Sequence, residues 1–255
     1  MISMLHMGRC GSTVLAHMLR QHDIAEIEWD GEIFERQFNG DLIDNRTIPP
    51  LIFLQKRIAR SQSQLFGFET KCHPDQHLAP DWVGLSIAAY IDSLYQLGFT
   101  DFILLQRRNY LRQLVSFYMG WQRGWWHLPA GEQAPLSRVV IDPAHCRIAQ
   151  QQKPIRALFE ELDETYQEIK QALQPQGFLA LSYEDDIAAD PTVAYRKVAA
   201  RIGLRPIEPQ IPFTQSNPFA LHDVIANYDK IVAALVDTPY EWMLELPVAS
   251  PLVNV

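Results

Sequence analysis

Apolar residues along the chain gather in short runs that are separated by longer segments of helical periodicity. The runs predict four buried β-strands, at Ile2–Met7, Leu65–Lys71, Phe102–Arg107 and Phe178–Ser182. Apolar residues recur at helical spacing in Ser12–Arg20, 109–121, Lys153–Leu173 and Asp190–Leu204. Strands that alternate with helices favour a parallel sheet, because each parallel connection crosses over one face of the sheet.

We therefore predict an α/β fold of three layers, with a mostly parallel central sheet and helices on both faces. The chain has 255 residues, 47% of them hydrophobic and 20% charged, which is enough for one sizeable core. It contains no internal repeat and no low-complexity linker, so we expect residues 1–255 to form a single domain. Within that domain, residues 205–255 are predicted to form a helical C-terminal closure.

The formal net charge of −8 narrows the range of partners. It disfavours broad contact with nucleic acid or an anionic membrane, since both repel an acidic protein. No stretch approaches the roughly 18 uncharged apolar residues of a membrane span, and the first apolar run is too short for a signal peptide. The three cysteines show no CxxC spacing and suit free thiols. We expect a cytoplasmic protein.

The first predicted strand is followed by Gly8-Arg9-Cys10-Gly11-Ser12-Thr13, which leads into the first predicted helix. Glycines let backbone amides approach an oxyanion, and the start of a helix adds its dipole. Ser12 and Thr13 add hydroxyl donors, and Arg9 adds charge. The pattern predicts an anion-binding loop. The alternative is a plain turn in which Ser12 caps the helix.

Two well-known anion loops do not fit this segment. A Walker A loop has the form GxxxxGK followed by Ser or Thr, whereas Gly8 and Gly11 lie three apart and no lysine precedes Ser12. A cysteine phosphatase loop has an arginine six residues after its thiolate, and that position here is Ala16. The segment is therefore predicted to be neither an ATP loop nor a phosphatase loop.

A second basic cluster follows the third predicted strand, where Arg107 and Arg108 precede Asn109, a predicted helix N-cap. Ser116 lies seven residues beyond Asn109, two turns along nearly the same face, so Arg108 and Ser116 could bracket a phosphate. Basic residues are unfavourable at the positive end of a helix dipole. Their placement indicates a compensating anion, and the simpler alternative is a solvated basic helix start.

Together these motifs resemble those of PAPS-dependent sulfotransferases, where PAPS is 3′-phosphoadenosine-5′-phosphosulfate. The family's 5′-phosphosulfate loop, K/R-x-G-S/T-T, is matched by Arg9-Cys10-Gly11-Ser12-Thr13. Its 3′-phosphate motif, RNPxxxxxS, is matched from Arg108 to Ser116, with Tyr110 in place of the proline. The resemblance implies a P-loop-like sulfotransferase fold, PAPS as the sulfuryl donor, and donor binding by the loop, Arg108 and Ser116.

A third match is the segment LSYEDDIAADP, Leu181–Pro191, which resembles the family's YEDLxxDP segment. It implies that Tyr183 belongs to the donor site. The family's later RKGxxGDW loop, which closes over the nucleotide, has no match in this chain. The chain therefore looks more like the bacterial trehalose-sulfating enzymes than like the animal cytosolic ones.

Sulfuryl transfer needs a base for the acceptor hydroxyl and cations for the charge that develops on the leaving phosphate; it requires no metal. Lys71 and His73 lie two apart at the end of the second predicted strand, so they point the same way in an extended chain. They resemble the family's KxH strand end, which implies that Lys71, with Arg9, stabilises the leaving side and that His73 is the general base. Glu32 is the rival base, because the trehalose-type relatives place a glutamate in that region.

Each of these assignments has a simpler alternative. His73 could be a surface histidine before a proline, and Glu32 could be a solvated charge, with Glu35, on an amphipathic helix. A metal site at Cys72, His73 and His77 would have too few ligands.

The acceptor is suggested only by the aromatic segment WQRGWWHLP, at Trp121–Pro129. Aromatic platforms suit sugars or apolar alcohols, and three core anchors are an equal alternative. We predict transfer of a sulfuryl group from PAPS to a hydroxyl of a small molecule or glycan. The alternatives are a P-loop-type nucleotide kinase and a catalytically inactive nucleotide-binding protein of the same fold.

Overall fold

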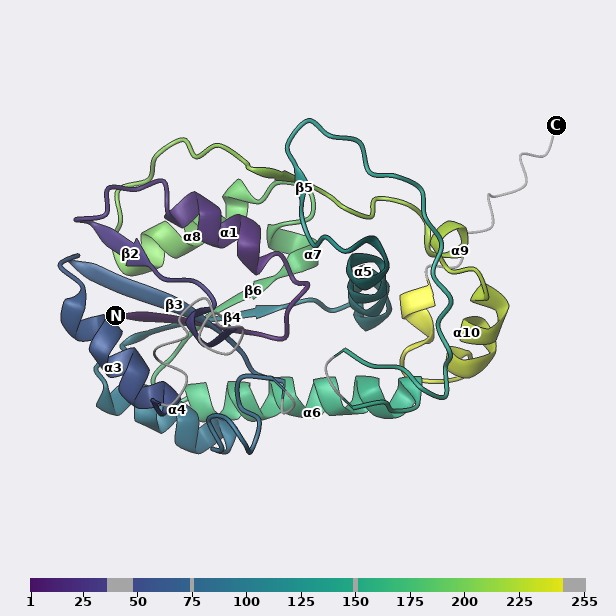
Figure 1. Cartoon of the computed structure of the whole chain (residues 1–255), viewed down its shortest axis with the longest axis horizontal. Helices are drawn as coiled ribbons and strands as arrows, with labels where there is room; N and C mark the ends of the chain where they lie inside the picture. The colour runs from purple at the N-terminus through teal and green to yellow at the C-terminus, as the bar shows by residue number, and fades with distance from the viewer. Residues whose placement is uncertain (36–47, 74–75, 149–150, 245–255) are drawn as a thin grey trace.

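A parallel β-sheet forms the centre of the molecule (Figure 1). The computed structural model describes residues 1–35, 48–73, 76–148 and 151–244. The strand order is β2-β3-β1-β4-β6, and every neighbouring pair is parallel. The strands are β1 (Ile2–His6), β2 (Ile27–Trp29), β3 (Leu65–Lys71), β4 (Asp101–Gln106) and β6 (Leu179–Ser182). Since β1 is the middle strand, the loop after it emerges at the centre of the carboxyl edge.

Helices cover both faces of this sheet, which confirms the predicted three-layer α/β fold (Figure 1). One face carries α1 (Ser12–Leu19) and α8 (Thr192–Ile202), and the other carries α3 (Pro50–Arg60), α4 (Ile87–Gln96) and α6 (Ile155–Leu173). The remaining elements are α5 (Tyr110–Arg123), α7 (Tyr183–Asp186), α9 (Leu221–Val224), α10 (Tyr228–Leu235), the 3-10 helix η2 (Glu241–Leu244) and an antiparallel pair of β5 (Leu128–Pro129) with β7 (Phe213–Thr214).

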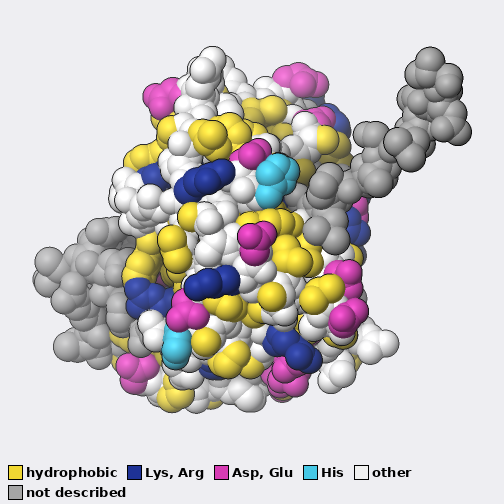
Figure 2. All heavy atoms as spheres, turned by 90° about the vertical axis from the view of Figure 1, so that its right-hand side faces the viewer, with side chains coloured by type: hydrophobic (Ala, Val, Ile, Leu, Met, Phe, Trp, Pro, Cys, Tyr) yellow, Lys and Arg dark blue, Asp and Glu magenta, His cyan; other side chains and the backbone are white. Residues whose placement is uncertain are grey.

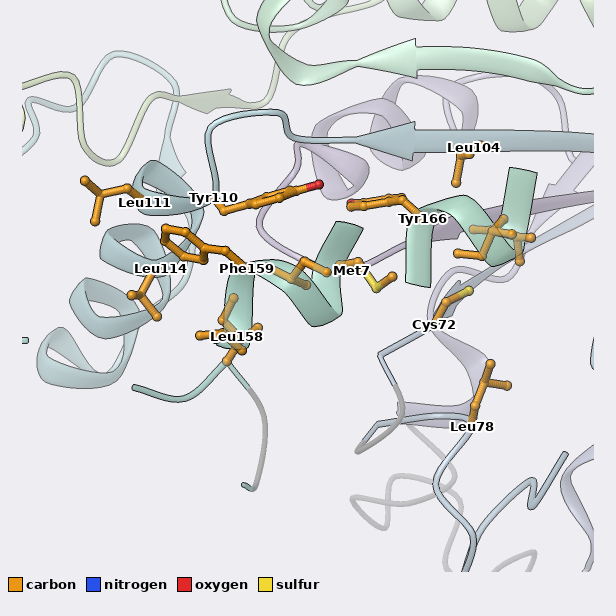
Figure 3. Packing of buried hydrophobic residues seen from close by; sticks show 14 of the residues in the cluster. Met7, Cys72, Leu78, Leu104, Tyr110, Leu111, Leu114, Leu158, Phe159 and Tyr166 are labelled. Carbon is orange, nitrogen blue, oxygen red and sulfur yellow. The ribbon is translucent and has the colours of Figure 1, made fainter. Parts of the chain in front are cut away.

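The larger hydrophobic cluster lies between the sheet and the layer of α4 and α6 (Figure 3). Within it, the ring of Tyr110 stacks on that of Tyr166, with centroids 6.3 Å apart and planes at 7°. The Tyr110 hydroxyl donates to Asp163 of α6 at 2.7 Å. Tyr110 thus ties the start of α5 to α6, which accounts for an aromatic residue where the resembling motif has a proline.

The predicted strands and helices agree with the structure to within two residues at their ends. Asn109 is the N-cap of α5, and its side chain accepts from the Arg112 amide at 2.9 Å. Gly203 ends α8 in the left-handed conformation that lets a helix stop. The elements that were not predicted include β2, α3 and α4. The three residues of β2 are too few to show a strand period.

The face formed by the α9 and α10 end of the molecule carries basic, acidic and hydrophobic side chains interspersed (Figure 2). On this face no broad basic surface gathers, as the net charge leads one to expect. Among the described helices, none combines the length and the apolar character that crossing a bilayer requires.

Candidate active site

The loop between β1 and α1 has a backbone that only a glycine-rich segment adopts readily. Gly8, Arg9 and Gly11 have positive φ angles of 78°, 53° and 89°. A Cβ at Gly11 would lie 2.8 Å from Ile187 Cγ2, so this position needs a residue without a side chain. Gly11 is the N-cap of α1, and no described side chain caps the helix. The first-turn amides are therefore open to a ligand or to water, and the interpretation of Ser12 as the cap of the helix is wrong.

Two arginines meet at this loop: Arg9 is half-buried and Arg107 is buried. Arg9 donates from Nε to Ser116 Oγ at 3.1 Å and from Nη2 to the Trp126 carbonyl at 2.9 Å. Arg107 follows β4; it donates to the Arg9 carbonyl at 3.0 Å, and its Cζ lies 4.3 Å from the centroid of the Tyr183 ring. Within the described chain, neither guanidinium forms an ion pair with a carboxylate.

Burial makes this pair of cations unfavourable. Burial, and then the neighbouring Arg107, lower the pKa of Arg9 to about 10, and burial lowers the pKa of Arg107 as well. Both groups remain charged at neutral pH. Arg107 Nε is buried and has no hydrogen-bond partner in the part of the chain that the structure describes. A buried cation is costly unless an anion compensates it, so the geometry favours an anionic ligand here.

A cavity of about 330 Å³ opens in front of these groups. We call it the arginine cavity. Its described lining contains no aspartate and no glutamate. Its lining includes the polar side chains of Arg9, Ser12, Thr13, Arg107, Ser116 and Tyr183.

A second cavity, of about 630 Å³, lies on the other side of the loop, and we call it the tryptophan cavity. Its wall includes the aromatic side chains Trp82, Phe117, Trp121 and Trp126, and the carboxylates Glu32, Glu35 and Asp81. Trp121 is 52% exposed, so the interpretation of this aromatic segment as a set of core anchors is wrong for it. The two cavities share Arg9, Ser12, Thr13, Trp126 and His127.

Lys71, the last residue of β3, lies between two carboxylates in the tryptophan cavity. Its Nζ is 2.8 Å from Glu32 Oε2 and 3.2 Å from Glu35 Oε2. Although burial alone would lower the pKa of Lys71, Glu32 and Glu35 raise it. His77 also lies at Glu35, with its Nε2 3.3 Å from Oε2. The hydrogen bond from His77, together with Lys71, lowers the pKa of Glu35.

Behind Glu32, the buried side chains of His6 and Glu69 complete the cluster. His6 Nε2 lies 3.4 Å from Glu69 Oε2 and 4.0 Å from Glu32 Oε1. The Gly8 amide lies 2.9 Å from His6 Nδ1. An amide only donates, so Nδ1 is the acceptor and the ring proton is on Nε2.

The charged groups around His6 favour a second proton on its ring. Burial lowers the pKa of His6, whereas Cys10 and Glu69 raise it, to about 10 in balance. A second proton would have to occupy Nδ1, where the Gly8 hydrogen already lies. The neutral tautomer is therefore the one that fits this geometry.

His6, Glu32 and Glu69 are also the one group among the described residues with the spacing of metal ligands. A histidine ligand offers one ring nitrogen to the metal and donates from the other. Here the second nitrogen, Nδ1, accepts instead, which leaves Nε2 protonated and unable to ligate. The ammonium of Lys71 beside Glu32 further disfavours a cation. The residues present do not fit a metal ion.

His73 lies away from both cavities. It is 2% exposed, and its Nε2 lies 3.8 Å from Glu161 Oε2 of α6. The strand ends at Lys71, so the alternation that would have aligned His73 with Lys71 does not continue. The structure brings Lys71 together with Glu32, because β2 pairs with β3 and the chain after β2 continues alongside β3, with the Glu69 amide donating to the Gly31 carbonyl. It does not bring Lys71 together with His73.

Arg108 also lies outside the described lining of the two cavities. Its Nη2 donates to Asp185 at 2.6 Å on the exposed surface. The Glu184 carboxylate accepts from the backbone amides of Arg108 and Asn109 at 3.0 Å. The anion expected at the start of α5 is thus supplied by the chain itself, and Ser116 is bracketed with Arg9 rather than with Arg108.

The other predicted site residues divide between ligand-facing and structural positions. Ser12, Thr13 and Tyr183 line the arginine cavity. Cys10 is fully buried in the hydrophobic cluster beneath α1. Sequence reasoning missed His6, Glu69 and His127. A buried strand conceals the first two, and nothing in the local pattern marks His127 as lining both cavities.

No protein-family model matches this chain, and no curated protein matches it either. The fold and the site define a three-layer α/β protein with a glycine-containing loop at the centre of the carboxyl edge of its parallel sheet.

Proposed function

We propose that this chain is a PAPS-dependent sulfotransferase. The observation that carries the proposal is the pair of arginines, half-buried Arg9 and buried Arg107, at a glycine loop and in a cavity lined by no described carboxylate. A donor with a phosphosulfate and a 3′-phosphate supplies the anions that these cations lack. The resemblance of the loop, of the Arg108–Ser116 segment and of the Tyr183 segment to sulfotransferase motifs supports the same conclusion.

The two cavities suit the two substrates of such a reaction. The donor would lie in the arginine cavity, with its phosphosulfate against the open amides of α1 and the hydroxyls of Ser12 and Thr13. The acceptor would lie in the tryptophan cavity and approach the sulfur at the shared residues. In the transfer, the bond from the acceptor oxygen to sulfur forms as the bond from sulfur to the 5′-phosphate oxygen breaks.

Residues near the place where the two cavities meet would take up the proton and the charge of this step. Glu32 is the better placed of the two predicted bases, since it lines the tryptophan cavity and His73 does not. It would take the proton of the acceptor hydroxyl. Lys71 and Arg9 would stabilise the charge that develops on the departing 5′-phosphate.

The acceptor we propose is a hydroxyl of a small molecule or glycan that carries no anionic group. Trp121 and Phe117, with ring centroids 5.5 Å apart, offer an apolar face, and carboxylates accept from hydroxyl groups. Glu32, Glu35 and Asp81 outnumber the two cations Arg9 and Lys71 in the lining, so an anionic acceptor would be repelled.

The rival enzyme is a metal-dependent nucleotide kinase. Such enzymes hold Mg²⁺ with a loop hydroxyl and a carboxylate, and neither a Walker lysine nor a described carboxylate lines the arginine cavity. We therefore expect EDTA to leave the rate of PAPS turnover unchanged. A strict Mg²⁺ requirement would favour the kinase.

The experiment that tests the proposal is a transfer assay with ³⁵S-labelled PAPS across matched neutral and anionic acceptors, such as a phenyl glucoside and the corresponding glucuronide. Labelled product from a neutral acceptor supports the enzyme. Tight binding of adenosine 3′,5′-bisphosphate without turnover on any acceptor or on water would favour the inactive binding protein instead.

A further inference from the structure

His6 joins the two halves of the site through its two ring nitrogens. It is the last residue of β1 and is fully buried. One nitrogen, Nδ1, accepts from the Gly8 amide, and the other, Nε2, faces Glu69 and Glu32. No other described histidine contacts both the anion loop and the carboxylates of the tryptophan cavity.

The bond to Gly8 matters because the loop has an unfavourable backbone. Gly8 and Arg9 both have positive φ, and a non-glycine residue in that region is strained. The Gly8 peptide is held at both ends, since its amide donates to His6 and its carbonyl accepts from Gln113 Nε2 at 2.6 Å. These bonds determine where the Arg9 guanidinium and the amides of α1 point.

The second ring nitrogen of His6, Nε2, lies near the carboxylates of Glu69 and Glu32, which concern proton transfer from the acceptor. Glu69 accepts from Trp29 Nε1 at 3.0 Å. Although burial opposes ionisation, His6 and Trp29 lower the pKa of Glu69, so that it remains ionised beside Glu32. The Nε2–H of His6 lies 3.4 Å from Glu69 Oε2 and 4.0 Å from Glu32 Oε1, and no described atom accepts a hydrogen bond from it, so its attraction for the two carboxylates is electrostatic.

We propose that His6 is a positioning residue with two separable roles: its Nδ1 fixes the loop after β1 for donor binding, and the electrostatic attraction of its Nε2–H holds Glu32 in place for proton transfer. This inference rests on the proposed function, because both roles refer to the transfer of a sulfuryl group. His6 itself touches neither substrate.

Two substitutions separate the roles. In His6→Asn the side-chain oxygen takes the place of Nδ1 and nothing replaces Nε2. In His6→Gln the amide takes the place of Nε2 and nothing replaces Nδ1. The readouts are the Kd of adenosine 3′,5′-bisphosphate by calorimetry, and the rate of ³⁵S-PAPS cleavage at saturating donor with water as acceptor, which requires no known acceptor.

We expect His6→Asn to keep the Kd within about threefold, as the Gly8 bond survives, and to cleave PAPS ~10-fold to 100-fold more slowly, the scale of a misplaced catalytic group. We expect His6→Gln to weaken the Kd by ~3-fold to 10-fold, the scale of one hydrogen bond, and to keep most of the rate. His22→Asn and His22→Gln are the matched controls, since His22 is buried against Tyr195 away from the site.

Equal losses of affinity and rate in both variants, or no loss in either, would overturn the inference. If the variants do not fold, ¹⁵N spectra of the wild-type histidines decide, because His6, identified through its contact with the Gly8 amide, must carry its proton on Nε2. A proton on Nδ1 would contradict both roles. A wild-type protein that binds no adenosine 3′,5′-bisphosphate refutes the proposed function instead, and the ¹⁵N result still tests the bond to Gly8.

Discussion

The arginine cavity and the tryptophan cavity share one loop but differ in charge and polarity. The first presents two cations and no described carboxylate, whereas the second presents three carboxylates, two cations and an aromatic wall. In a chain with a net charge of −8, such a concentration of unpaired positive charge costs stability. Under the proposed function, the two sides of Arg9 would therefore hold substrates of different charge, one strongly anionic and one not.

The largest expected effect comes from the carboxylate side. Glu32→Gln removes the base with little change of shape, so we expect kcat to fall by ~10²-fold to 10⁴-fold while the affinity for adenosine 3′,5′-bisphosphate stays the same. The measurement is the rate of ³⁵S transfer at saturating donor.

The matched control is His73→Gln, which alters a histidine that lines neither cavity. If His73→Gln abolishes turnover and Glu32→Gln keeps more than about a tenth of it, the base is His73, as the KxH resemblance implies.

The second prediction concerns the arginine side. Arg107→Ala removes a charged donor, so we expect the affinity for adenosine 3′,5′-bisphosphate to fall by ~1.5–3 kcal/mol, or roughly 10-fold to 150-fold. Arg108→Ala is the matched control. It also removes an arginine side chain, but Arg108 is paired with Asp185 at the surface. Calorimetry measures both. A larger loss of affinity in Arg108→Ala would show that Arg108 binds the 3′-phosphate, as the sequence motif implies.

The sequence supports the sheet and the anion loop because both depend on local patterns. Short apolar runs and the glycines around Arg9 indicate their structure without reference to distant residues. Contacts between residues that are distant in sequence could not be predicted from such local patterns. Nothing near Arg108 shows that Glu184 accepts from its amide, and nothing near Lys71 shows that β3 ends there.

The candidate base illustrates the same limit. The spacing of Lys71 and His73 predicts a shared direction only while the strand continues, and the strand stops one residue too early. Glu32 is close to Lys71 only because β2 pairs with β3, and the sequence does not show which strands are neighbours. His6 was missed because a buried strand residue has the same pattern whether it packs or positions a loop.

A smaller effect is expected at the aromatic wall. Trp121→Ala removes an exposed platform from the tryptophan cavity, so we expect the acceptor KM to rise by ~2-fold to 10-fold with the donor KM unchanged. Initial rates with a neutral glycoside measure both constants. An equal rise in the donor KM would show that the two cavities do not separate the two substrates.

The smallest effect concerns stability. The pKa of Glu35 is lowered in the folded protein, so its ion pair contributes fully above the carboxyl's ordinary pKa of 4.5, and the contribution is lost as the pH falls from there through the lowered folded pKa. The stability difference between wild type and Glu35→Gln should therefore shrink as the pH falls from about pH 5 towards about pH 2. Because Glu35 is 39% exposed, we expect less than ~1 kcal/mol in urea denaturation. A constant difference across this range would contradict the pairing.

The most direct test of the central claim is the nucleotide selectivity of the arginine cavity. Calorimetry of the wild-type protein with adenosine 3′,5′-bisphosphate, adenosine 5′-monophosphate and ATP–Mg²⁺ compares ligands that share one base and differ in their anions. The account predicts that the bisphosphate binds ~10-fold or more tightly than the monophosphate, since the 3′-phosphate adds charged hydrogen bonds. It also predicts that Arg107→Ala removes most of this preference. Preferred binding of ATP–Mg²⁺, or equal binding of the bisphosphate and the monophosphate, would contradict it.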